Sequence, residues 1–273
     1  IKGREEILNV HAKIKKFADG VSFASLAAGT PGFTGADLEN MLNEAAILAT
    51  RRGLKEITMS ELNEAATRVM MGPEKKSRII TPEDKKITAY HEAGHAVASL
   101  KLENCDPVRE ISIISRGQAA GYTMTMPGNE YSHTSKSKLY DEIAMLLGGR
   151  ATEEVLLGEI CTGAYSDLKR AAEIARKMVT EYGMSDKLGP LFLGGDTEIF
   201  VGRDYTQHSN LSDAFASHID DEIKSIVEQQ YERIKQVVSE NTEGIQRVVN
   251  ALIEREYLTG EQFTKVFNGE ELA

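Results

Sequence analysis

The chain has 273 residues, of which 41% are hydrophobic and 27% are charged, as in an ordinary globular protein. Its net charge of -10 argues against nucleic acid as a partner, because nucleic-acid binding needs a basic surface. Cys105 and Cys161 fit neither a disulfide framework nor a zinc-ribbon spacing, so we expect free thiols in a reducing compartment. Neither a membrane-spanning run nor a signal peptide is visible, but the chain starts at Ile1, so we expect a longer parent protein.

Residues 1–72 are predicted to form a helical bundle. Thr34 precedes apolar residues at helical spacing, in a helix that should end near Gly53. Thr58, with Glu61 three residues later, has the form of a capping box and opens another helix. About 70 residues are enough for a small helical domain with its own core.

Residues 73–80 are interpreted as a linker, because the sequence from Gly72 onward is charged, contains Gly and Pro and lacks an apolar stripe. A long surface loop within one domain is the alternative. The second domain is predicted to span 81–273 and to be mainly α-helical with one small β-sheet. Thr81 and Pro82 mark the start of a helix that should run to about Leu102. Strands are expected at 110–115 and 121–126, and further helices at 137–157, 165–182, 212–240, 242–255 and 260–267.

The sequence His91-Glu92-Ala93-Gly94-His95 places two histidines four residues apart in the predicted helix. Four residues correspond to about one helical turn, so both imidazoles point the same way and can bind one metal ion. Glu92 lies about 100° around the helix, where it can act on a metal-bound water without binding the metal. The alternative is a pair of histidines in the protein core. The His-Glu-x-x-His spacing on a capped amphipathic helix favours a zinc peptidase site.

A catalytic zinc site needs a third protein ligand, and position 101, where one class of zinc proteases has a histidine, is Lys101. Asp167 heads an otherwise apolar helical stripe, so it is a candidate ligand, although it could also cap its helix. Glu153 and Glu154 are the other candidates. Each could bind the metal, accept a hydrogen bond from a ligating histidine, or be a surface charge. The spacing leaves this choice open.

The chain resembles the FtsH-type ATP-dependent zinc metalloproteases, an AAA+ protease family, from Gly3 to about Phe267. The resemblance rests on stretches in the family's order: residues 3–8, 30–38, 43–46, 90–96, 121–123, 148–151, 162–164 and 166–169. It implies zinc ligands at His91, His95 and Asp167 and a catalytic glutamate at Glu92. It further implies that the first segment is the helical lid of an AAA+ ATPase, with a partial nucleotide contact at Gly35, Ala36 and His11.

The resemblance also implies a homohexamer that uses ATP to unfold polypeptides and cuts them processively. The chain contains no phosphate-binding loop, so we expect it to keep only the partial nucleotide contact and not to hydrolyse ATP; ATP and ADP are expected as cofactors of the full-length parent only. We expect the parent to be anchored in a membrane by an N-terminal segment, at the cytoplasmic face of a bacterial inner membrane, although an organellar membrane is the alternative.

Residues Gly121, Tyr122, Thr123, Met124 and Thr125 form a predicted strand that Pro127 ends. Because proline favours sheet edges, we expect this strand to pair with an extended substrate peptide. The alternative is an ordinary paired strand. For the chain as a whole, the alternatives to a peptidase are a non-catalytic assembly or adaptor module that keeps the fold, and a nucleotide-sensing module. The intact His91, Glu92, His95 and Asp167 argue against the first, and the missing phosphate loop against the second.

Overall fold

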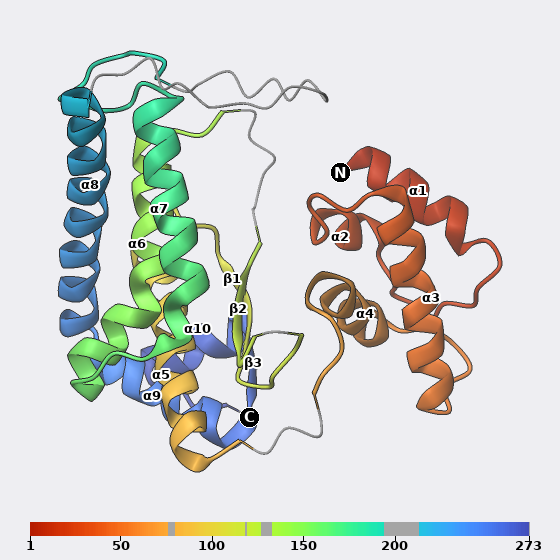
Figure 1. The fold of residues 1–273 in the computed structure, drawn as a ribbon. Helices are drawn as coiled ribbons and strands as arrows, with labels where there is room; N and C mark the ends of the chain where they lie inside the picture. The colour runs from red at the N-terminus through yellow and green to blue at the C-terminus, as the bar shows by residue number, and fades with distance from the viewer. Residues whose placement is uncertain (76–79, 118, 127–132, 194–212, 273) are drawn as a thin grey trace. The chain divides into compact units, whose positions relative to one another are not determined.

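The structure is a computed structural model that describes residues 1–75, 80–117, 119–126, 133–193 and 213–272. The chain divides into two compact units (Figure 1). Within the described residues, the first unit contains the chain from Ile1 to Ile80 together with Ile114–Gly121 and Met126. The second unit contains Thr81–Ile113, Tyr122–Thr125 and the described residues from 133 onward. Each unit has its own hydrophobic core.

The first unit is helical, with α1 at Lys2–Ala12, α2 at Phe23–Ala28, α3 at Gly35–Arg51 and α4 at Met59–Met71. The predicted capping box of Thr58 and Glu61 is present, and Thr34 forms a second one with Asp37 at the start of α3. The core contains fully buried side chains from α1, α3 and α4: Leu8, Leu38, Met41, Leu42 and Leu62. The short helix α2 was not predicted from the sequence.

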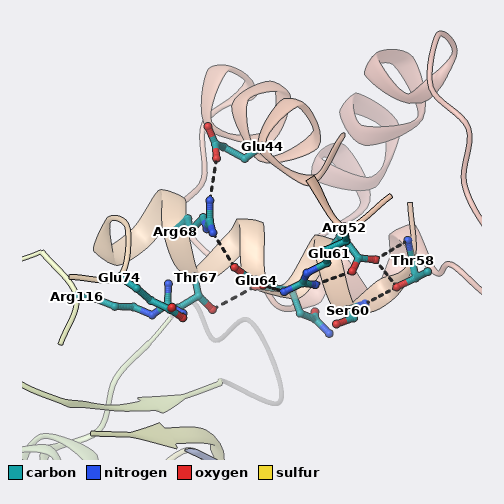
Figure 2. A network of polar contacts seen from close by, with 11 residues as sticks. Glu44, Arg52, Thr58, Ser60, Glu61, Glu64, Thr67, Arg68, Glu74 and Arg116 are labelled. Atoms are coloured by element: carbon teal, nitrogen blue, oxygen red, sulfur yellow. Dashed lines mark hydrogen bonds and ion pairs between the residues drawn. The ribbon is translucent and has the colours of Figure 1, made fainter. Parts of the chain in front are cut away.

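Charged side chains join α3 to α4 (Figure 2). Arg52, at the end of α3, donates to Glu61 at 2.6 Å and also to Glu64, both on α4. Arg68 on α4 donates to Glu64 at 2.8 Å and lies 3.7 Å from Glu44 on α3. Glu61 is 2% exposed, so the burial of its charge is compensated by Arg52 and by the Thr58 cap. These contacts hold the two helices in register on their polar side.

The second unit begins with four long helices in chain order: α5 at Pro82–Lys101, α6 at Lys136–Thr152, α7 at Tyr165–Thr180 and α8 at Asp213–Glu240. It ends with α9 at Thr242–Arg255 and α10 at Gly260–Asn268. Helices α6, α7 and α8 run side by side (Figure 1). Asp141 on α6 accepts hydrogen bonds from Arg233 on α8 at 2.6 Å and from the backbone of Asn104 at 3.0 Å. It therefore ties both α8 and the segment after α5 to α6.

One antiparallel sheet of three strands lies in this unit, in the order β2-β1-β3. Strand β1 spans Val108–Ser112, β2 spans Tyr122–Thr125 and β3 spans Tyr257–Thr259. The first strand was predicted at 110–115, so its position was wrong by two to three residues, and β3 was not predicted. The predicted fold class, mainly α with a small β-sheet, is confirmed. No helix among the described residues combines the length and the apolar character that are needed to cross a bilayer.

Candidate metal centre

Helix α5 carries both histidines of the motif. Thr81 caps its start by accepting from the Asp84 backbone, and Pro82 occupies the first turn, as the sequence predicted. His91, Glu92 and His95 are all buried, in the half of the helix that packs into the core. The histidine rings lie edge to face, with their centroids 4.7 Å apart. The helix thus turns both imidazoles inward at one point.

Three side-chain atoms converge at this point. The Nε2 atoms of His91 and His95 are 3.0 Å apart. The Oδ2 atom of Asp167, in the first turn of α7, lies 3.4 Å from Nε2 of His91 and 3.7 Å from Nε2 of His95. Among the described residues, these three form the one group with metal-ligand geometry. Asp167 is not the cap of its helix, because the N-cap position is Ala164 and no side chain caps there.

The distances between these atoms bracket those expected around a tetrahedral zinc ion. Ligand atoms about 2.0–2.2 Å from zinc, at tetrahedral angles, lie roughly 3.3–3.6 Å from one another. The three distances between the ligand atoms span 3.0–3.7 Å. Two imidazoles and a carboxylate are also a common donor set for catalytic zinc, which leaves a fourth position for water.

The other nitrogen of each imidazole is occupied by a hydrogen bond. Nδ1 of His91 lies 2.6 Å from Oε1 of Glu153, and Nδ1 of His95 lies 2.8 Å from the Met145 carbonyl oxygen. Because each Nδ1 atom faces a hydrogen-bond acceptor, both Nε2 atoms are left to face Asp167, where they can bind a metal ion once they carry no proton. Glu153 is 1% exposed, and its second oxygen accepts from the Cys161 backbone at 2.8 Å.

Glu153 begins a π-helical turn, Glu153–Leu157, that directly continues α6. Such turns insert an extra residue into a helix and often occur at functional sites. Glu154, the next residue, bonds instead to Tyr231 and lies 3.6 Å from Lys235, both on α8. The two glutamates that the sequence could not distinguish therefore have different partners.

Glycines make room for the site between α5 and α6. A Cβ atom on Gly149 would lie 2.5–2.7 Å from three atoms of the His91 ring. A Cβ atom on Gly94 would collide with the Gly148 carbonyl and the Thr152 hydroxyl, so the two helix backbones touch at this point. Small residues are thus required both for the close packing of α5 on α6 and for the position of the His91 ring.

Glu92 is 6% exposed, and its carboxylate Oε2 lies 2.9 Å from the hydroxyl of Thr123 on β2. Burial raises the pKa of Glu92 above its usual value, and this rise is opposed by the charges of His95 and His91 and by the Thr123 hydrogen bond. A carboxyl with a raised pKa, buried beside two potential metal ligands, has the properties of a general base.

The charges of the cluster are strongly coupled. Burial alone would lower the pKa of His91, but its contacts with Asp167 and Glu153 raise this pKa to about 10. Burial alone would raise the pKa of Asp167, but hydrogen bonds from His91 and His95 hold it well below its usual range. The carboxylates therefore favour a positive charge between them, and a metal cation bound there would displace the His91 proton.

The other predicted site residues lie in both units. In the first unit, Gly35 and Ala36 begin α3. His11 lies in the last turn of α1, with its Nδ1 atom 3.9 Å from Oε1 of Glu39 on α3. The predicted substrate segment coincides with β2 for Tyr122, Thr123, Met124 and Thr125, whereas Gly121 precedes the strand. Strand β2 lies at an edge of the described sheet. Pro127 lies outside the described residues.

Sequence reasoning missed two partners of the site. The hydrogen bond from Thr123 to Glu92 joins residues that are 31 apart in the chain, and no sequence spacing signals it. The partner of His95 is the backbone carbonyl of Met145, so the identity of the residue at position 145 does not indicate this contact. Gly149 lies in a Gly-Gly pair within α6. Such a pair is unfavourable for helix formation and could have indicated a close contact.

Residues 78–266 match peptidase family M41, and residues 20–64 match the AAA+ lid domain. The chain is 56% identical over 273 residues to the ATP-dependent zinc metalloprotease FtsH 1 of Thermoanaerobacter sp. strain X514. This match covers 100% of the chain and 45% of that protein. It is 51% identical over 266 residues to the FtsH of Caldicellulosiruptor bescii, with 97% of this chain and 43% of that protein covered. The chain is 46% identical over 270 residues to the FtsH of Thermus thermophilus, and this match covers 98% of the chain and 43% of that protein.

The fold and the His-His-Asp cluster thus belong to a metallopeptidase, the class that the motif predicted. The chain is a member of peptidase family M41. The predicted resemblance to the FtsH-type zinc metalloproteases is confirmed. The chain spans less than half the length of the curated relatives described above.

Proposed function

We propose that this chain is the peptidase portion of an ATP-dependent zinc protease, with zinc held by His91, His95 and Asp167 and with Glu92 as the catalytic base. The convergence of the three ligand atoms within 4.8 Å of one another carries this proposal. Their spacing, the Nδ1 hydrogen bonds that leave both Nε2 atoms facing one point, and the relatives' names support it.

Zinc held by His91, His95 and Asp167 would supply a Lewis acid that lowers the pKa of a water molecule toward about 7 and polarises a peptide carbonyl. Glu92 would take a proton from the attacking water and pass it to the amine that leaves. Its buried position keeps bulk water from competing for that proton. Glu153 holds the ring of His91 in the orientation that binding requires.

The substrate is proposed to be an unfolded polypeptide that adds to the open edge of β2, along Gly121, Tyr122, Thr123, Met124 and Thr125. Support comes from the edge position of β2 and from its direct contact with Glu92 through Thr123. Backbone pairing of this kind binds extended chains with little selectivity for side chains. It therefore suits a protease that cuts many different sequences.

In the longer protein, residues 1–72 are proposed to be the lid of an AAA+ ATPase, 73–80 a linker and 81–273 the peptidase domain. The lid match at 20–64 supports this division. Gly35, Ala36 and His11 would form a partial contact with ATP or ADP, supported by the placement of His11 beside the first turns of α3. We further propose a homohexamer anchored to a membrane, with this portion on the cytoplasmic face. The relatives' names support the ATP-driven step.

The test is zinc content per chain together with cleavage of a fluorescence-quenched unstructured peptide, for the wild type, Asp167→Ala and Glu92→Gln. We expect about one zinc in the wild type and much less in Asp167→Ala. Glu92→Gln should keep its zinc and lose cleavage by a factor on the order of 1000 or more, because it lacks the base. Full zinc content in Asp167→Ala would mean that a residue other than Asp167 is the third zinc ligand. A zinc-loaded wild type without cleavage would favour the non-catalytic assembly module.

A further inference from the structure

Thr123 makes a contact that a residue of a simple substrate-binding strand does not need. Its Oγ1 atom lies 2.9 Å from Oε2 of Glu92 and 3.0 Å from the backbone oxygen of the same residue. Among the described residues, Thr123 is the sole hydrogen-bond partner of the Glu92 carboxylate. A buried carboxylate with a single partner depends on that partner for its position.

The direction of this hydrogen bond follows from the groups involved. An ionised carboxylate only accepts, so the Thr123 hydroxyl donates to Oε2 when Glu92 is ready to take a proton. The backbone oxygen of Glu92 is a second acceptor within 3.0 Å of the same hydroxyl, so Thr123 lies against both the main chain and the side chain of Glu92.

We propose that Thr123 is a positioning residue for Glu92, and that the Thr123 hydroxyl holds the Glu92 carboxylate in place. This inference rests on the proposed function, in which Glu92 is the base. It assigns two separate tasks to β2. The backbone edge binds substrate, whereas the Thr123 side chain fixes the base, so the strand sets the register between the scissile bond and the group that acts on it.

The kinetic test compares zinc-loaded wild type with Thr123→Val, which keeps the shape but lacks the hydroxyl, and Thr123→Ser, which keeps the hydroxyl. Thr123→Val should lower kcat by roughly 10–100-fold, as is typical when a supporting hydrogen bond in an active site is lost, and leave KM within about twofold. Thr123→Ser should restore most of kcat. Zinc content should be the same in all three proteins.

The matched control is Thr180→Val on α7, which also removes a threonine hydroxyl bonded to a backbone carbonyl, at an exposed site. It should leave kcat and KM unchanged. A rise in KM with an unchanged kcat in Thr123→Val would make Thr123 a substrate contact and overturn the proposal. An unchanged kcat and KM would also overturn it.

A second readout does not depend on turnover. In crystal structures of the zinc-loaded proteins, the Glu92 carboxylate should leave its position in Thr123→Val and keep it in Thr123→Ser. An unmoved carboxylate in Thr123→Val would contradict positioning by Thr123. If the zinc-loaded wild type cleaves no peptide, the proposed function fails, and this comparison still decides what Thr123 does.

Discussion

Glu153 supports the proposed metal site through its contact with the ligand His91. It is fully buried and contacts His91 at 2.6 Å on the side of the ring away from Asp167. We expect Glu153→Gln to weaken zinc binding about 10–100-fold, because an amide holds the ring less firmly and makes it less basic. The measurement is the Kd for zinc in competition with a chromophoric chelator.

The neighbouring Glu154 provides a matched control. Its carboxylate contacts Tyr231 and Lys235 and makes no contact with either histidine. Glu154→Gln should therefore keep the Kd of the wild type for zinc. Equal losses in the two variants would mean that net negative charge, and not the hydrogen bond to His91, determines the affinity.

Gly149 leads to a second prediction at this scale. Alanine is favoured over glycine within a helix by about 1 kcal/mol, so Gly149→Ala would ordinarily stabilise α6. Here the added methyl group would lie 2.5–2.7 Å from the His91 ring, and the ring must move. We expect Gly149→Ala to lose most of its zinc, measured as zinc per chain after exhaustive dialysis. Gly163→Ala, where a Cβ would meet nothing within 4 Å, should retain it.

At the scale of elements, the polar tie between α6 and α8 should determine part of the acid stability. Burial alone would raise the pKa of Asp141, but hydrogen bonds from Asn104 and Arg233 outweigh it and lower this pKa. A carboxyl with a lowered pKa stabilises the fold above its unfolded pKa of about 4, and this stabilisation is lost as pH falls through the folded pKa.

We therefore expect Asp141→Asn to lose about 1.5–3 kcal/mol of unfolding free energy at pH 7, measured by urea denaturation, because a charged acceptor is removed. The difference from wild type should shrink as pH falls below about 4. Glu142→Gln is the control. Its partner Arg170 has a 62% exposed side chain, so this change should cost under about 0.5 kcal/mol. A pH-independent loss in Asp141→Asn would contradict the assigned role.

Elements with local signals were predictable, and those without were not. The starts of helices α3, α4 and α5 could be predicted because each follows an N-cap threonine, at Thr34, Thr58 and Thr81. Strand β3 has three residues, and its partner residues lie about 147 positions earlier, so no local pattern reveals it. The π-helical turn at Glu153–Leu157 continues α6 with no visible break in the helical period of the sequence, so the role of Glu153 could not be predicted.

The histidine pair was predictable because its four-residue spacing is a property of the helix itself.

At the scale of the whole molecule, the two cores imply two unfolding events. All the proposed zinc ligands lie in the second unit, whereas the first has a core of its own. We expect calorimetry to show two transitions, of which only one responds to zinc. Free zinc at about 1000 times its Kd adds about 4 kcal/mol to the unit that binds it, which raises its Tm by roughly 8–16 °C. Asp167→Ala should abolish this shift. A single transition that moves as a whole would contradict the prediction.

The position of β3 in the sheet has a consequence for how the protein is made. Tyr257 on β3 donates to Glu110 on β1, 147 residues earlier, so the ribosome must add that length of chain before the sheet can close. At about 5–20 residues per second, this takes roughly 7–30 s. Within that interval, the helices that carry His91, His95 and Asp167 are complete once residue 180 has been added, but part of the core that supports them is still missing until β3 and α10 are made. A nascent chain should therefore capture metal late, and stalling translation between residues 193 and 257 should leave a zinc-poor, protease-sensitive intermediate.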